Sequence, residues 1–275
     1  MSICPRRVYV IAAACLAFFL AGPRPAHALV LDWNSVSWSN ASMVNFASVA
    51  NSFDLNGDSV KDVTIGITAQ NNTLITDPTT GAQTPAINET LTGGQTAGQK
   101  SLMVAGNLFT HSDLTVQLSF NNAPGQFAAT NVSFTIFDID LTTNNDIISS
   151  IYGVAPDGTF VPGTITNVGS SASLTGTGFL QTLTGNVPSP DSGPGSSNGN
   201  ATISFGSTVT DIFFTFSNTA GAPRYQDIAL GNISFTPVPE INPAATSGIS
   251  CLLALGLTVL VQRRAKLKAR RLRAA

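Results

Sequence analysis

Charged side chains are scarce in this chain of 275 residues, since Lys, Arg, Asp and Glu together make up only 10% of it. The charges are also unevenly distributed. All 15 acidic residues lie between Asp32 and Glu240, and this middle portion holds only three basic residues, so its net charge is −12. Such a surface repels phosphate backbones and attracts divalent cations. The sequence therefore predicts no nucleic-acid partner and makes calcium a candidate cofactor.

Cysteine is equally rare, and its positions exclude two kinds of structural support. The three cysteines are Cys4, Cys15 and Cys251, so the residues from 16 to 250 can form neither a disulfide nor a thiolate metal site. The middle portion must be stabilised by burial instead. Its roughly 210 residues suffice for one core, because chains of this length bury about 70% of the surface that they expose when unfolded.

Histidine and glutamate are too few for most catalytic sites. The histidines are His27 and His111, and the glutamates are Glu89 and Glu240. No Gly-x-Ser-x-Gly turn accompanies His111, and a zinc site would need a further histidine. We therefore expect no enzymatic activity. A polysaccharide hydrolase that uses two aspartates is a distant alternative, because only a structure reveals whether two carboxyl groups lie about 5.5 Å or about 6.5–9.5 Å apart.

Apolar residues at helical spacing are also absent from the middle portion. Short apolar runs with period-two alternation are separated there by Gly, Asn, Asp, Pro and Ser, a pattern typical of strands. It predicts an all-β domain at 29–237, an antiparallel β-sandwich of the jelly-roll kind with long loops at 77–100 and 185–199. The stretch 131–138 carries apolar groups on both faces, which indicates a central strand. The clearest expected strands are 63–68, 114–120, 131–138, 147–154, 201–205, 210–216 and 228–236.

The N-terminus has the form of a secretory signal at 1–28. Basic residues precede an apolar stretch from 8 to 20, and Ala26-His27-Ala28 is a small-x-small site that signal peptidase cuts, leaving Leu29 first. A lipoprotein signal at Cys15 is the weaker alternative, because the apolar stretch continues past that cysteine. We expect export across the bacterial inner membrane.

The C-terminus, 238–275, combines three elements in order. The motif Val-Pro-Glu-Ile-Asn-Pro at 238–243 is followed by an uncharged apolar run at 244–261 and a basic tail at 263–273. The 18 residues of the apolar run would extend about 27 Å as a helix, just enough for a hydrocarbon core of about 30 Å. Basic residues stay on the cytoplasmic side. We therefore expect a single transmembrane helix, either a permanent or a temporary anchor in the inner membrane.

This order of elements resembles the PEP-CTERM sorting signal of bacterial exosortase substrates. The matching residues are Pro239, Glu240, the apolar run, and the basic block that begins with Arg263 and Arg264. Ile241-Asn242-Pro243 departs from the family, which usually has proline directly after glutamate. The resemblance implies cleavage near the Pro-Glu element by an exosortase-type enzyme, a place at the cell surface or outside the cell, and a link to extracellular polysaccharide and biofilm.

Oxygen-bearing side chains at alternate positions make one loop the first candidate calcium site. Asp54, Asn56, Asp58 and Asp62 supply the oxygens, and Gly57 permits a tight turn. Calcium takes about six to eight oxygen ligands, but this spacing does not fit an EF-hand, in which the glycine and a final glutamate stand elsewhere. The alternative is an ordinary hairpin turn with solvated acids on either side.

A second candidate calcium site comprises Asp138, Asp140 and Asp146, with Asp227 as a further candidate ligand. On a strand, Asp138 and Asp140 would project to one face, where two carboxylates repel one another unless a cation or hydrogen-bond donors lie between them. The alternative is a polar strand end that leads into a loop. The sequence spacing does not fix how far Asp227 lies from the other three.

Aromatic residues offer platforms for sugars, because rings pack on the apolar faces of sugar rings. The available platforms are Trp33, Trp38, Tyr152 and Tyr225. The two tryptophans would point to opposite faces of one strand, so we expect at least one in the core. The sequence predicts a non-enzymatic structural or adhesive protein linked to surface polysaccharide. A calcium-dependent carbohydrate-binding module is the alternative.

Overall fold

The computed structural model describes residues 27–239, apart from 71–72, 79, 109–112, 121–125, 142–143, 189–194 and 221–223. The signal sequence up to residue 26 lies outside these residues, and so does the C-terminal signal from Glu240 on, including Pro243, Arg263 and Arg264. Within the described part, no helix is long and apolar enough to span a membrane.

Sixteen strands and one short 3-10 turn, η1 (Gly178–Leu180), make up the described part of the chain. One sheet contains β1 (Leu29–Leu31), β4 (Ala86–Asn88), β5 (Ser101–Leu108), β7 (Gln126–Phe137), β10 (Thr164–Thr166), β13 (Ala201–Phe205), β15 (Arg224–Leu230) and β16 (Ile233–Pro239). The other contains β2 (Ser48–Phe53), β3 (Val63–Ala69), β6 (Leu114–Ser119), β8 (Asp146–Val154), β9 (Phe160–Pro162), β11 (Ala172–Thr175), β12 (Thr182–Gly185) and β14 (Asp211–Asn218).

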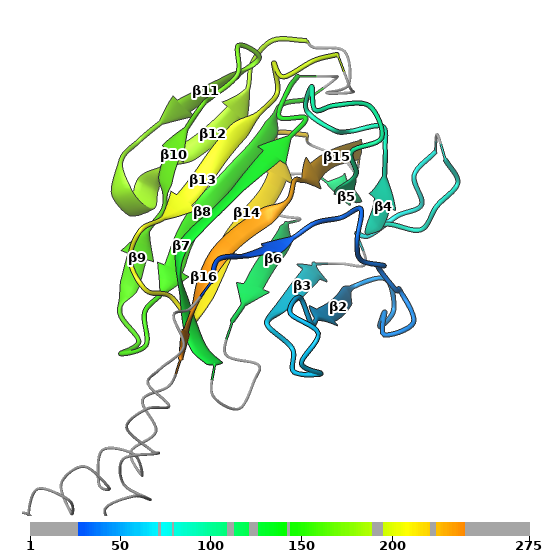
Figure 1. Ribbon diagram of the computed structural model, residues 1–275. Coiled ribbons are helices and arrows are strands. Elements are labelled where there is room, and N and C mark those ends of the chain that lie inside the picture. The colour runs from blue at the N-terminus through cyan, green and yellow to red at the C-terminus, as the bar shows by residue number, and fades with distance from the viewer. Residues whose placement is uncertain are drawn as a thin grey trace, which may run out of the picture.

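The two sheets are antiparallel and stack as a sandwich (Figure 1). In the first sheet the order is β1-β16-β7-β15-β5-β4, and β13 also pairs with β7 and with β10. In the second sheet the order is β11-β12-β8-β14-β6-β3-β2, and β9 pairs with β8. The expected all-β antiparallel sandwich is confirmed. So is the central place of the 131–138 stretch, because β7 has three partner strands, β13, β15 and β16.

Period-two alternation explains why these strands form a sandwich. On β14, Ile212, Phe214 and Phe216 are buried in the core, whereas Phe213 and Thr215 point outward and are half-buried. The same alternation occurs on β3 and β6. Each buried apolar side chain contributes roughly 1.5–3 kcal/mol to stability relative to an exposed one, so the rows that face each other between the sheets hold the fold together.

The expected strand 228–236 is wrong in one respect, because it is two strands. β15 ends at Leu230 and β16 begins at Ile233. Between them, the Gly231 amide donates a hydrogen bond to the Thr135 carbonyl (2.8 Å), and a Cβ at Gly231 would lie 2.7 Å from the Phe137 ring. The hydropathy pattern does not show this break, because apolar residues continue on both sides of it.

The last strand also runs past the expected domain boundary at 237. Pro237 and Val238 pair with Ala129 and Ala128 of β7, so the first residues of the C-terminal motif belong to the sheet. The chain enters the sandwich beside this strand, because β1 pairs with β16. In Figure 1, β16 leaves the sandwich at the lower end.

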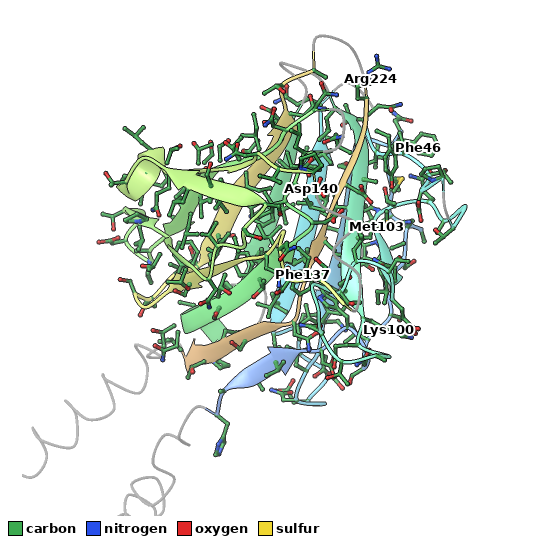
Figure 2. All side chains as sticks on the ribbon, turned by 90° about the horizontal axis from the view of Figure 1, so that it is seen from above. Phe46, Lys100, Met103, Phe137, Asp140 and Arg224 are labelled. Atoms are coloured by element: carbon green, nitrogen blue, oxygen red, sulfur yellow. The ribbon has the colours of Figure 1, made fainter. Side chains whose placement is uncertain are left out.

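The outer face of the first sheet is covered. The segment 73–100, most of which we expected as a loop, packs Leu91 against Met103, Phe137 and Ala229 in a second apolar cluster. Figure 2, which looks from above, shows Met103 on the side where this segment lies, with Phe137 nearer the middle of the molecule. The first sheet is therefore buried on both of its faces here.

Candidate functional site

The loop between β2 and β3, the first candidate calcium site, is closed by its own side chains. Asp54 accepts hydrogen bonds from the Gly57 and Ser59 amides, at 2.7 and 2.8 Å. Asn56 and Asp58 each accept one from the amide two residues further on, at 3.0 and 2.8 Å. Side-chain oxygens that bond to nearby amides in this way are typical of turns.

Asp62 is the buried member of this loop and accepts a hydrogen bond from the Leu55 amide at 2.7 Å. Burial raises its pKa, and the charges of Asp58 and Asp54 add to the effect. For Asp54, desolvation also raises the pKa, but the amide hydrogen bonds, led by that of Gly57, outweigh it and the pKa lies below its ordinary value. These contacts fit the turn interpretation, and calcium binding at the loop stays a prediction.

The second candidate site lies at the other end of the sandwich, where β7 leads into β8. Asp138, Asp140 and Asp146 are all buried there, and Asp227 of β15 is half-buried. The Asp140 amide donates to Asp146 Oδ2 (3.2 Å), and the Asp146 amide donates to the Asp140 carbonyl (3.0 Å). Figure 2 shows Asp140 near the middle of the molecule in the end-on view. The structure thus brings these predicted residues to one region.

Asp146 is the most strongly perturbed of the four aspartates. Its burial raises its pKa well above the ordinary value, the Asp140 amide offsets this only in part, and the charges of Asp138, Asp140 and Asp227 raise it further. Its Oδ1 atom is buried and has no hydrogen-bond partner among the described residues. A carboxyl group in this setting favours its protonated form or a nearby cation.

The expectation that Asp138 and Asp140 share one face of a strand is wrong. β7 ends at Phe137, and Asp138 has a φ of 69°, in the left-handed region, so the alternation of faces stops there. In the described part of the chain, no group of three or more His, Cys, Asp or Glu side chains is arranged to hold a metal ion. Calcium binding near Asp146 stays a prediction.

Tyr225, one of the expected sugar platforms, is engaged with carboxylates. Its hydroxyl lies 3.1 Å from Asp227 Oδ2 and 3.4 Å from Asp77 Oδ1, and it donates toward both. Burial raises the pKa of the Tyr225 hydroxyl, and these two carboxylates raise it further. Tyr225 therefore helps to order the covered outer face of the first sheet.

The two tryptophans also belong largely to the core. Trp33 is fully buried, and its indole N–H donates to the Gly231 carbonyl at 2.9 Å. Trp38 is half-buried, and its ring lies 6.4 Å from that of Trp33 and 6.3 Å from that of Phe53, measured between centroids. The expectation that at least one tryptophan lies in the core is confirmed. Trp38 still lines a depression of about 410 Å³, which Lys100 also borders.

Tyr152, the remaining expected platform, lies on the open outer face of the second sheet. Gly66 of β3, Gln117 of β6, Phe213 of β14 and Tyr152 of β8 stand in one cross-strand row. The rings of Tyr152 and Phe213 stack with centroids 5.3 Å apart, and Phe160 of β9 meets Tyr152 edge-to-face at 5.2 Å. Three aromatic rings therefore stand together on this surface, and Phe160 is 63% exposed.

A carboxylate stands beside these rings in the neighbouring row. Asp211 of β14 is opposite Ser119 of β6 and Val154 of β8, and the Gln117 side-chain amide donates to Asp211 Oδ1 at 2.9 Å. Both members of this hydrogen-bonded pair are half-buried. We use the name aromatic face for the surface formed by Gly66, Gln117, Tyr152, Phe160, Asp211 and Phe213.

Gly66 makes a low step in the aromatic face. A Cβ at this position would have only the Cβ and Oε1 atoms of Gln117 within 4 Å, both at 3.9 Å, so the space above Gly66 is open. The step borders an amide that belongs to the same row as Phe213. A sugar presents C–H groups and hydroxyls. Aromatic rings can pack on the C–H groups, and amide and carboxylate side chains can form hydrogen bonds with the hydroxyls, so this surface is suited to a sugar.

Hydroxyl side chains continue the surface on the other side of the aromatic row. Thr68, Thr115, Thr215 and Ser149 form the next cross-strand row over β3, β6, β14 and β8, and all four are half-buried or exposed. Each hydroxyl can both donate and accept hydrogen bonds. Of the aromatic face, the sequence alone indicates only Tyr152, because cross-strand partners are not visible in a sequence.

The chain matches no protein-family model and no curated protein sequence. Among solved structures it is similar to TmCBM27, a carbohydrate-binding module described as recognising mannan, with 10% identity and a TM-score of 0.33 over 78% of this chain and 99% of that one. It is also similar to a family 11 carbohydrate-binding module from Clostridium thermocellum in complex with a β-1,3-1,4-mixed-linked tetrasaccharide, with 12% identity and a TM-score of 0.27 over 78% of this chain and 97% of that one.

A further similarity is to the enzymatically active domain of tailspike protein 4 of bacteriophage CBA120, with 14% identity and a TM-score of 0.20 over 74% of this chain and 21% of that one. Similarities this remote do not assign a function.

Proposed function

We propose that this chain is an exported surface protein that binds polysaccharide on its aromatic face. The observation that carries the proposal is the group of three rings, Phe213, Tyr152 and Phe160, on the outer face of the second sheet, with Gly66 further along the row of Phe213 and Tyr152. A group of rings on an outer sheet face, one exposed and two half-buried, with hydrogen-bonding groups at its side is typical of a binding surface. The role is structural or adhesive, in the cell surface or its polysaccharide layer.

Binding without turnover is the second part of the proposal. Hydrolysis of a glycosidic bond normally uses two carboxyl groups on opposite sides of that bond. Asp211 is the one carboxylate in the three cross-strand rows described here, and it is hydrogen-bonded to Gln117. We therefore expect the bound polysaccharide to be released unchanged in length.

Export and sorting by an exosortase-type system complete the proposal. The pairing of Pro237 and Val238 with β7 supports it, because a cut after Glu240 would leave the sandwich whole. Mass spectrometry of protein extracted from the cell surface tests this part. We expect a mature C-terminus between Pro239 and Pro243, and an intact arginine-rich tail on the surface protein would contradict it.

Native affinity gels that contain soluble polysaccharides of neutral, acidic and amino-sugar composition test the binding itself. We expect the full-length chain, extracted in mild detergent, to be retarded by at least one of them. Tyr152→Ala should weaken that retardation about tenfold or more, because it removes the ring that contacts both of the others. The matched control is Phe46→Ala, which removes a ring that is 53% exposed and lies outside the aromatic face. Equal retardation of both variants and the parent chain would contradict the proposal.

A further inference from the structure

The aromatic face carries a single formal charge, and that charge is negative. In its three cross-strand rows, Asp211 is the one charged side chain among the described positions. None of the described lysines and arginines belongs to these rows. Lys100 pairs with Glu89 at 3.6 Å beside the first sheet, Arg224 begins β15 in the first sheet, and Lys61 lies in the loop before β3.

Further acidic groups border the same end of the second sheet. The row of Asp211 continues through Ser119 to Thr64, directly after the loop that holds Asp54 and Asp58. In the other direction, the turn between β8 and β9 carries Asp157.

This last carboxylate is poised to keep its charge. Asp157 accepts hydrogen bonds from the Thr159 hydroxyl and amide at 2.7 and 2.9 Å, and these bonds lower its pKa. Carboxylates therefore lie beyond both ends of the Asp211 row. Lys61 belongs to the same loop as Asp54 and Asp58 and offsets part of their charge, but that loop stays acidic overall, so both ends favour a cationic ligand.

Aromatic rings add a second attraction for positive charge. The faces of Tyr and Phe rings are negative, so they attract ammonium groups within about 6 Å, and several rings next to a carboxylate form a recognised kind of ammonium site. The Tyr152 ring contacts both the Phe160 ring and the Phe213 ring. Asp211 stands two residues before Phe213 on β14, so the two side chains lie on the same side of the strand. The rings and the carboxylate thus favour the same type of ligand.

We propose that the polysaccharide bound by the aromatic face carries positively charged amino groups, as a deacetylated amino-sugar polymer does. This inference rests on the proposed function and names its ligand class. Asp211 bonds to an ammonium group through its carboxylate while Gln117 holds that carboxylate in place, and the rings pack on the sugar and on its charge. An acidic polysaccharide is repelled by the same surface.

Two matched oligosaccharides test this inference. A glucosamine hexamer and a glucose hexamer of the same linkage differ only in an amino group in place of one hydroxyl on each sugar. We expect the full-length chain in mild detergent to bind the glucosamine hexamer about tenfold more tightly in isothermal titration calorimetry at low salt and mildly acidic pH. The preference should shrink as salt is added, because screening weakens charge interactions on a surface.

Two substitutions with the same change in net charge separate the site from the overall acidity of the protein. Asp211→Asn should bring the affinity for the glucosamine hexamer down to that for the glucose hexamer. Glu89→Gln, beside the first sheet, should leave the preference unchanged, since exposed ion pairs such as that with Lys100 contribute little. Equal loss in both variants would overturn the inference, because general charge attraction would then explain the preference.

The remaining outcomes distinguish this inference from the function on which it rests. If both hexamers bind equally and Tyr152→Ala weakens both, the inference fails and polysaccharide binding stands. If neither hexamer nor any polysaccharide in the affinity gels binds, the proposed function fails and the inference falls with it.

Discussion

The outer faces of the two sheets differ in what lies on them. On the first sheet, the segment 73–100 covers an apolar cluster around Phe137, which is only 1% exposed. On the second sheet, the residues of the aromatic face are half-buried or exposed, and Phe160 is 63% exposed. An antiparallel sheet needs only one buried face, so the covered face adds stability that the fold does not strictly require. We conclude that covered side chains govern stability and that the open rings are available for a ligand.

Truncation on the covered face should have the largest effect on stability. Phe137→Ala removes the ring on which Leu91 and Met103 pack, and such a change typically costs about 3–5 kcal/mol. The free energy of unfolding in urea measures it, and polysaccharide binding by the folded fraction should be unchanged. A loss of binding without a loss of stability would reverse the roles that we assign to the two faces.

A glycine on the same face provides an independent check. Gly93 has a φ of +60°, and a Cβ there would lie 2.2 Å from the Phe137 ring. Gly93→Ala should therefore also destabilise the protein. Gly81→Ala is the matched control, because Gly81 has a φ of +71° but nothing within 4 Å of its Cβ position. Equal destabilisation of the two variants would show that the backbone conformation, and not the contact with Phe137, is responsible.

The buried carboxyl group of Asp146 should make the stability of the protein depend on pH. Its raised pKa means that its contribution to stability is complete below the unfolded-state pKa of about 3.9 and is lost as the pH rises through the raised value. Asp146→Asn should remove this loss. The stability of the variant relative to the parent chain should therefore increase as the pH rises above about 4, where the buried carboxyl of the parent chain resists ionisation. A difference between the two proteins that does not vary with pH in urea unfolding would contradict this account.

The effect of calcium on the melting temperature is a second test of the Asp146 carboxyl group. A ligand that binds only the native state raises the melting temperature by mass action. If the predicted calcium site near Asp146 exists, about millimolar calcium should raise the melting temperature and a chelator should lower it, and Asp146→Asn should abolish the response. Asp54→Asn should abolish it instead if the ion binds in the loop between β2 and β3. A melting temperature that neither calcium nor chelator changes would contradict both calcium predictions.

The smallest expected change in stability is on the open face, and it has the opposite sign. Gly66→Thr places a β-branched side chain on the low step, where its Cβ meets nothing closer than 3.9 Å. Because glycine inside a strand costs about 0.5–1 kcal/mol relative to a residue with a side chain, the variant should be slightly more stable. Its polysaccharide binding should be weaker, since the step is filled. Unchanged binding in gels would place the ligand away from Gly66.

Local patterns were enough to predict much of the fold. Alternation located β3, β6, β8, β13 and β14 and identified β7 as central, since most of the inward-facing residues are apolar; Asp146 on β8 and Asn218 on β14 are buried polar exceptions at strand ends. The split between β15 and β16 was hidden, because Gly231 is placed by contacts with Phe137 and Thr135, which are distant in sequence. The left-handed conformation of Asp138 was hidden for a similar reason, as nothing in an Asp-Ile-Asp sequence ends a strand.

The candidate site was harder to predict than the fold. Tyr152 and Phe213 stack although they are 61 residues apart in the sequence, and Gln117 donates a hydrogen bond to Asp211, which lies 94 residues further on. These contacts depend on strand order and register, which a single sequence does not specify. By contrast, the gathering of Asp138, Asp140 and Asp146 was predictable, because all three flank one short connection.

Hydroxyl-radical footprinting tests most directly whether a glycan occupies the aromatic face. The full-length chain is oxidised with and without a bound amino-sugar polymer, and the oxidation of each ring is measured by mass spectrometry. We predict that Tyr152, Phe160 and Phe213 become protected, whereas Phe46, which is 53% exposed and lies outside the aromatic face, is oxidised equally in both samples. Protection of Phe46 or Trp38 with no change at the three rings of the aromatic face would contradict the account.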